Sequence, residues 1–181
     1  MPRRRSASVA AVIIAVMTLA VAVSMAGCAD GATAPRAASV PSEAAALNPS
    51  RVFEGSLSSF RFHSAYLTPQ RLVIRTSEQW SEAWTQITRN LLPPPPAPPV
   101  DFDREMVILV AMGQRPTGGY VITVDGVYDA AGRIFAEVRE TSPGAGCITT
   151  AALTQPVDAV RIPRRDGAVI FVERDETVVC R

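Results

Sequence analysis

A run of seven apolar residues, 106–112, places the strongest constraint on what this 181-residue chain can fold into. The run reads MVILVAM, which is rich in Val and Ile and too short for a free-standing helix, and Gly113 closes it. A run of this kind is typical of a strand that is covered on both faces. We therefore expect a fully buried strand over residues 106–112.

A second strand follows after a short, glycine-rich loop. Tyr120, Ile122 and Val124 alternate with more polar residues, which predicts a half-buried strand. The simplest arrangement of the two strands is a central hairpin spanning residues 106–124.

The connection between these strands is a candidate partner-binding loop. Pro116 fixes one φ angle, and Gly118 and Gly119 permit the positive φ values that other residues avoid. Two interpretations stay open: a shaped loop that contacts a partner, or simply the turn that the hairpin needs. The candidate binding residues are Arg115, Pro116, Thr117, Gly118, Gly119 and Tyr120.

The N-terminus has the pattern of a secretion signal. Three arginines at positions 3–5 precede an apolar stretch over residues 9–23, which is too short for a comfortable transmembrane helix. The stretch ends in SMAGC, which resembles the lipobox of bacterial lipoproteins, with Met25 where Leu is usual. That resemblance implies cleavage before Cys28, acylation of its thiol, and a protein anchored by lipid to a membrane of the cell envelope. An ordinary secretory signal with an incidental cysteine is the alternative.

Three parts of the chain follow from this pattern. We expect a signal peptide at residues 1–27, a disordered Ala/Ser/Pro-rich tether at 28–50, and a single globular domain at 51–181. Loss of residues 1–27 removes three of the 18 basic residues and no acid, so 15 Arg face 17 acidic residues and the net charge is −2. This balance does not indicate a nucleic-acid partner.

The predicted domain is α+β and dominated by strands. The predicted strands are residues 53–63, 71–76, 133–141, 157–162, 169–173 and 177–180. The strand at 133–141 is the predicted antiparallel partner of 120–127.

A helix is expected at about residues 77–90, capped by Thr76 or Ser77, with its two tryptophans on one face. We interpret that face as an anchor to the core rather than a ligand platform. The seven residues 93–99 (PPPPAPP) should form an extended strap back to the central strand. Together these features predict antiparallel sheets in a sandwich-like arrangement with one amphipathic helix.

Cysteine usage predicts a disulfide bond. If Cys28 carries lipid, Cys147 and Cys180 remain as a pair in an oxidising compartment. A bridge between them would contribute roughly 3–4 kcal/mol by the chain-entropy estimate. Two free thiols, or a metal pair, are the weaker alternatives.

The sequence contains no recognisable catalytic set, metal site or cofactor motif, so we expect a protein that is not an enzyme. His63 is the single histidine, and we expect it to be solvated. Asp101, Asp103 and Glu105 form an acidic cluster that we interpret as bonding the turn before the buried strand.

Four segments of the chain resemble the PrcB C-terminal domain family. They are residues 100–107 (VDFDREMV), 113–120 (GQRPTGGY), 140–147 (ETSPGAGC) and 160–163 (VRIP), and the likeness covers roughly residues 75–180. The family takes its name from a lipoprotein subunit associated with a subtilisin-like protease complex, where it supports assembly or stability. The resemblance therefore implies an extracytoplasmic accessory protein that binds another protein, for which a protease is one candidate.

A shorter similarity implies a different mechanism. Residues 115–120 (RPTGGY) resemble the NPTTGY loop of chagasin-type cysteine-protease inhibitors, which enters the protease cleft. Arg115 and Gly118 depart from that pattern, and the other inhibitory loops are not evident. Direct protease inhibition through this loop is the alternative function.

Overall fold

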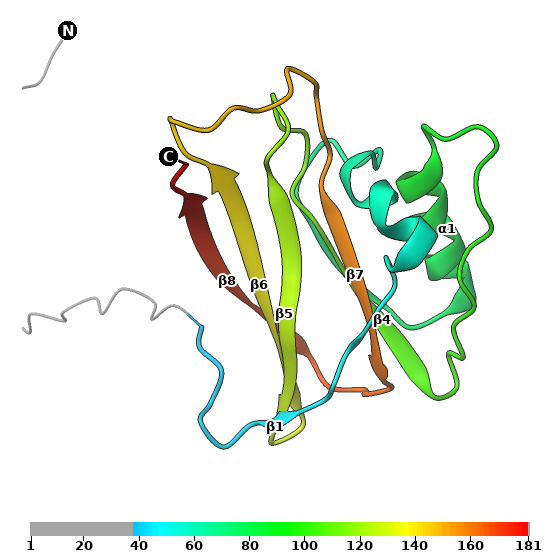
Figure 1. The fold of residues 1–181 in the computed structure, drawn as a ribbon. Helices are drawn as coiled ribbons and strands as arrows, with labels where there is room; N and C mark the ends of the chain where they lie inside the picture. The colour runs from blue at the N-terminus through cyan, green and yellow to red at the C-terminus, as the bar shows by residue number, and fades with distance from the viewer. Residues whose placement is uncertain (1–37, 181) are drawn as a thin grey trace, which may run out of the picture. The chain divides into compact units, whose positions relative to one another are not determined.

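The domain consists of two packed four-stranded sheets with a helix on the outer face of one of them (Figure 1). The computed structural model describes residues 38–180. Sheet A has the order β1-β5-β6-β8, with β1 at Ala45–Ala46, β5 at Val121–Ala130, β6 at Arg133–Pro143 and β8 at Val169–Val178. Sheet B has the order β2-β7-β4-β3, with β2 at Ser50–Arg51, β7 at Val157–Pro163, β4 at Glu105–Ala111 and β3 at Gln70–Ile74.

Strand β4 is buried on both faces, as the apolar run predicts. Each residue from 106 to 112 is at most 2% exposed. The odd-numbered residues Val107, Leu109 and Ala111 join the core cluster under the helix, whereas Met106, Ile108 and Val110 join the cluster between the sheets. One strand thus contributes to two separate cores, because successive side chains point to opposite faces.

Helix α1, Ser77–Thr88, forms where the sequence predicts it and packs through its predicted face. The Thr76 hydroxyl accepts a hydrogen bond from the Gln79 backbone amide at 3.3 Å, which caps the first turn. Trp80 and Trp84 are 4% and 5% exposed, so they anchor the helix as expected.

The proline-rich strap is held by the tryptophans of α1. The indole Nε1 of Trp80 donates to the Pro98 carbonyl at 3.0 Å, and that of Trp84 donates to the Pro95 carbonyl at 2.8 Å. An indole N–H can only donate, so it needs an acceptor, and a proline still has its backbone carbonyl as an acceptor although it has no N–H. The strap therefore gives both buried indoles the partner that they need.

The predicted central hairpin is wrong. Strands β4 and β5 lie in different sheets, and residues 112–120 carry the chain from sheet B to sheet A. The physical reason is that β3 and β7 already occupy both edges of β4. Strand β5 instead pairs with β6, in the antiparallel arrangement predicted for residues 120–127 and 133–141, with a register shift between Val124 and Gly126.

The strand predicted at residues 53–63 is also wrong. A 3₁₀ helix, η1, occupies Gly55–Phe62, and Gly55 has a positive φ of 55°. Leu57 and Phe60 both pack against the core cluster under α1. Residues three apart share a face in a 3₁₀ helix, so this conformation brings both side chains to the core.

The two last predicted strands, 169–173 and 177–180, are a single strand that ends at Val178. Strand β8 pairs with β6 in parallel, which is an exception to the predicted antiparallel arrangement. The chain leaves β6, passes through β7 in sheet B and returns to sheet A, so it enters β8 in the same direction as β6. A disulfide joins Cys147 to Cys180, with Cα atoms 4.9 Å apart, just beyond the paired ends of these strands. The predicted disulfide and the predicted sandwich-like α+β class are both confirmed.

The folded region begins before the predicted boundary at residue 51. Ala45 and Ala46 pair with β5, and Ser50 pairs with β7, although the tether was predicted to extend to residue 50. The predicted signal peptide and Cys28 lie outside the described residues. Among residues 38–180, no helix is long and apolar enough to cross a membrane.

We expect Leu109→Ala to lower the free energy of unfolding by about 3 kcal/mol, since it leaves a cavity in the core under α1. Leu109 is fully buried, whereas Leu92 is 94% exposed. Leu92→Ala is therefore the matched control and should change stability by less than about 0.5 kcal/mol. Urea unfolding of both variants, followed by tryptophan fluorescence, measures the difference. Equal effects of the two substitutions would contradict the packing of β4.

Candidate functional site

Residues 113–120 form an ordered crossing between the sheets, fixed at its start by the segment before β3. Gly113 has a φ of +77°, and a Cβ there would lie 3.0 Å from the Pro69 nitrogen. The Gln114 amide donates to the Leu67 carbonyl at 3.1 Å. This close approach of two backbones requires glycine at position 113.

The middle of the loop is bonded to the connection between β6 and β7. The Arg115 amide donates to the Thr154 carbonyl at 2.8 Å, and the Thr154 amide donates back to the Arg115 carbonyl at 3.1 Å. The Thr154 hydroxyl donates to the Thr117 carbonyl at 2.8 Å, and the Gly118 amide donates to the Thr150 carbonyl at 3.0 Å. Backbone bonds of this number hold the two loops as one platform.

Packing restricts the two later glycines of the loop, Gly118 and Gly119. A Cβ on Gly118 would collide with the Thr150 hydroxyl. Gly119 has a φ of +87°, and a Cβ there would lie 3.1 Å from the Thr149 side chain. The left-handed backbone accounts for Gly119, and the close Thr150 hydroxyl favours glycine at position 118, so a binding role has to rest on the side chains that the loop exposes.

The guanidinium of Arg115 makes its charged contacts within the domain. Its guanidinium lies 5.8 Å from the centre of the Tyr120 ring, and its Nη2 is 3.4 Å from Oε2 of Glu140. Glu140 also accepts from Arg71 Nη2 at 2.7 Å, and Arg71 pairs with Glu173 at 2.8 Å. This network links β3, the loop, β6 and β8, so Arg115 and Tyr120 serve the domain's own architecture.

Exposed apolar side chains gather around this platform. We define the loop end as residues 65–69, 112–120, 144–156 and 178–180, which lie together at one end of the sandwich (Figure 1). In the described part of the chain, five of the six exposed large hydrophobic side chains belong to it, and Leu92 is the sixth. The five are Leu67, Ile148, Leu153, Val178 and Val179. Gln114, Pro116 and Gly119 are exposed beside them.

The single histidine and the acidic cluster lie outside the segments that define the loop end. His63 is exposed, and no cluster of three His, Cys, Asp or Glu side chains that could hold a metal occurs among residues 38–180. Within the acidic cluster at 101–105, the Asp101 carboxylate bonds its own turn, since its Oδ1 accepts from the Asp103 amide at 3.2 Å.

One buried carboxylate, Asp158 on β7, was not singled out by the sequence analysis. It is fully buried and faces sheet A. Its Oδ2 accepts from the Val124 amide of sheet A at 2.9 Å and from Nη1 of Arg51, on β2 of sheet B, at 2.9 Å. Arg61 Nη2 lies 3.5 Å from its Oδ1. These contacts join β7, β2 and η1 to the irregular part of β5, so Asp158 ties the two sheets together. In the sequence, Asp158 is the single acidic residue within a largely apolar predicted strand, and this pattern could have identified it.

The pKa of Asp158 is raised by burial, while Arg61, the Val124 amide and Arg51 oppose this shift. A carboxyl whose pKa is higher in the folded state binds its proton more tightly there. Its contribution to stability is therefore greatest at acid pH and decreases as the pH rises above its usual value of 3.8.

We expect Asp158→Ala to lower the free energy of unfolding by about 3 kcal/mol at neutral pH, because it leaves the buried Val124 amide without an acceptor. The stability difference from the wild type should shrink as the pH rises from 3.8 through the raised pKa. Asp166→Ala is the control, since the Asp166 side chain is 94% exposed. Chemical denaturation at several pH values measures both effects, and a difference that grows with pH would contradict this assignment.

Residues 106–163 match the family model described as PrcB C-terminal. The predicted PrcB resemblance is confirmed. The matched PrcB region begins within β4 and ends at the last residue of β7, so it includes the 113–120 loop and the 144–156 connection that together form most of the loop end. No curated protein and no solved structure matches the chain.

Proposed function

We propose that this chain is a non-enzymatic, lipid-anchored accessory protein of the cell envelope, whose loop end binds another extracytoplasmic protein. The candidate partner is a protease or another subunit of its complex. The protein would support assembly or stability of that complex rather than supply catalytic groups.

The observation that carries this proposal is the concentration of exposed apolar side chains on the loop end. An exposed cluster of this kind is unfavourable in water and is typical of a surface that a partner covers. The backbone bonds between residues 115–118 and 150–154 hold the platform in one shape before a partner arrives. A preformed surface loses little conformational entropy on binding, which favours recognition.

The PrcB match supports the choice of partner. The family is named for a lipoprotein subunit of a protease complex, and the match covers two of the four segments of the loop end, 112–120 and 144–156. Association with a protease complex is the function that the family supports.

The path of the chain into the domain is compatible with an anchor at the N-terminus. Strand β1 pairs with Tyr128 and Asp129, beside the β5–β6 turn, at the end of the sandwich opposite the loop end (Figure 1).

We expect a photo-crosslinking residue at Gln114 or Ile148 of the full chain to trap one discrete partner in the protein's native cells. Both positions are exposed on the loop end, and Ile148 is 103% exposed. The same crosslinker at Asp166, at the opposite end, is the control and should trap no such species. Immunoprecipitation and mass spectrometry identify the product.

Two results would count against an accessory role at the loop end. If crosslinkers at Gln114 and Asp166 trap the same species in equal amounts, the products arise from random collision rather than from binding at the loop end. Loss of the partner protease's activity on addition of the purified full chain would favour direct inhibition, the alternative that the NPTTGY-like residues imply.

We expect the full chain to incorporate radioactive fatty acid, and the Cys28→Ala variant to lose the label and leave the membrane fraction. Acyl chains on one residue hold a protein at a membrane surface without a spanning helix. Gel autoradiography of membrane and soluble fractions measures both. Equal labelling of the variant would rule out Cys28 as the anchor.

A further inference from the structure

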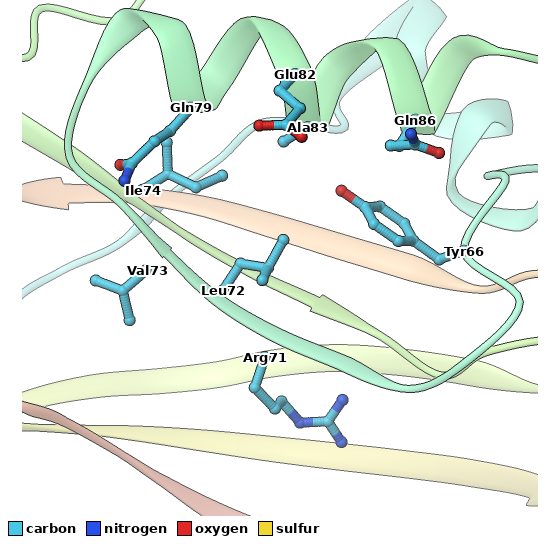
Figure 2. Close-up of a pocket in the computed structure, with 9 residues that line it drawn as sticks. All are labelled: Tyr66, Arg71, Leu72, Val73, Ile74, Gln79, Glu82, Ala83 and Gln86. Carbon is cyan, nitrogen blue, oxygen red and sulfur yellow. The ribbon is translucent and has the colours of Figure 1, made fainter.

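A groove lies between α1 and β3, on the side of sheet B away from sheet A (Figure 2). Its volume is about 320 Å³. Leu72 and Ile74 form its floor, and Ala83 and Glu82 of α1 line the opposite wall. Tyr66 lies at one end of the groove, whereas the Arg71 side chain extends from the other face of the sheet.

Strand β3 is the edge of sheet B. Which backbone groups of β3 face outward follows from which residues of β4 bond to β3 and which bond to β7. The Met112 amide donates to the Pro156 carbonyl of the chain leading into β7. In an antiparallel sheet, alternate residues bond to opposite neighbours, so even-numbered residues of β4 bond to β7 and odd-numbered residues bond to β3. On β3, the partners of the odd-numbered β4 residues Ala111, Leu109 and Val107 are Gln70, Leu72 and Ile74, respectively.

It follows that Arg71 and Val73 present their backbone N–H and C=O groups at the open edge. The next outward position, Arg75, is already occupied: its amide donates to Gln79 Oε1 at 2.8 Å, and its carbonyl accepts from Arg164 Nη1 at 3.2 Å. The available edge is therefore short, with space for a segment of about five residues at the spacing of a strand.

The helix side of the groove is acidic. Glu82 is exposed and forms no ion pair within residues 38–180. The guanidinium of Arg71 is held on the other face by Glu140 and Glu173, at 2.7 and 2.8 Å, and does not neutralise Glu82. Burial, and secondarily Glu82, raises the pKa of Tyr66 to about 12.

We propose that the β3 edge binds a short extended peptide by strand addition, with an apolar side chain over Leu72 and Ala83 and a Lys or Arg beside Glu82. Backbone bonds to Arg71 and Val73 would supply affinity, and the alternating side chains would supply selectivity. In such a strand, residues two apart point to the same face, so the apolar and basic residues are separated by one residue. This site shares no element with the loop end except the segment before β3, so the two proposals can fail independently.

The test measures binding of fluorescein-labelled Thr-Val-Thr-Arg-Thr, blocked at both ends, to the purified full chain by fluorescence anisotropy. We expect saturable binding below about 1 mM. The matched probe carries N-methyl groups on its threonine amides, which are the groups that would bond to β3. Because each backbone bond lost weakens binding several-fold, N-methylation should reduce the affinity by roughly tenfold or more.

A charge exchange tests the basic residue. Replacing Arg by Glu in the peptide should weaken binding to the wild type roughly fivefold, and Glu82→Arg should reverse this preference. Glu54→Arg is the control, because Glu54 is exposed and lies outside the groove. The proposal is overturned if the wild type does not saturate, if the N-methylated peptide binds equally, or if Glu82→Arg keeps the wild-type preference.

Discussion

Burial of β4 on both faces is the constraint on which the rest of the structure depends. A strand whose two faces are both shielded from water needs a partner strand on each edge and a packed layer on each face. Strands β3 and β7 fill the edges, α1 covers the face of Leu109, and sheet A covers the face of Ile108. The three-layer arrangement therefore follows from seven consecutive apolar residues.

The sequence predicts those elements whose signals are local. Thr76 and the tryptophan spacing define α1, and the alternation in 133–141 defines β6. It fails where the partner of a strand decides the outcome. A strand, a glycine-rich turn and a second strand have the local signals of a hairpin, but no local residue reveals that both edges of β4 are already taken. Likewise, Phe60 and Phe62 fit a period of two, whereas the core selects Leu57 and Phe60 at a period of three.

The candidate site shows the same division. The loop at 113–120 is visible in the sequence, but the need for Gly118 comes from Thr150, more than 30 residues away. Exposed residues such as Ile148 and Val179 are scattered along the chain and become a surface only when β6, β8 and the disulfide bring their segments together. The groove beside β3 lies between the edge strand of sheet B and helix α1. Local sequence patterns do not reveal which strand of a sheet lies at its edge.

The order of strands in the chain has a consequence for how the domain is made. Strands of the two sheets alternate along the second half, with β4 in sheet B, β5 and β6 in sheet A, β7 in sheet B and β8 in sheet A. Neither sheet can be completed from a contiguous stretch of chain. The MVILVAM segment has β3 before it in the chain, but its second partner, β7, lies some 50 residues further along, and long-range pairing of this kind is slow. Until β7 pairs with it, β4 presents an unpaired apolar edge, so the stage before this pairing is the one at which the folding chain is most prone to aggregate.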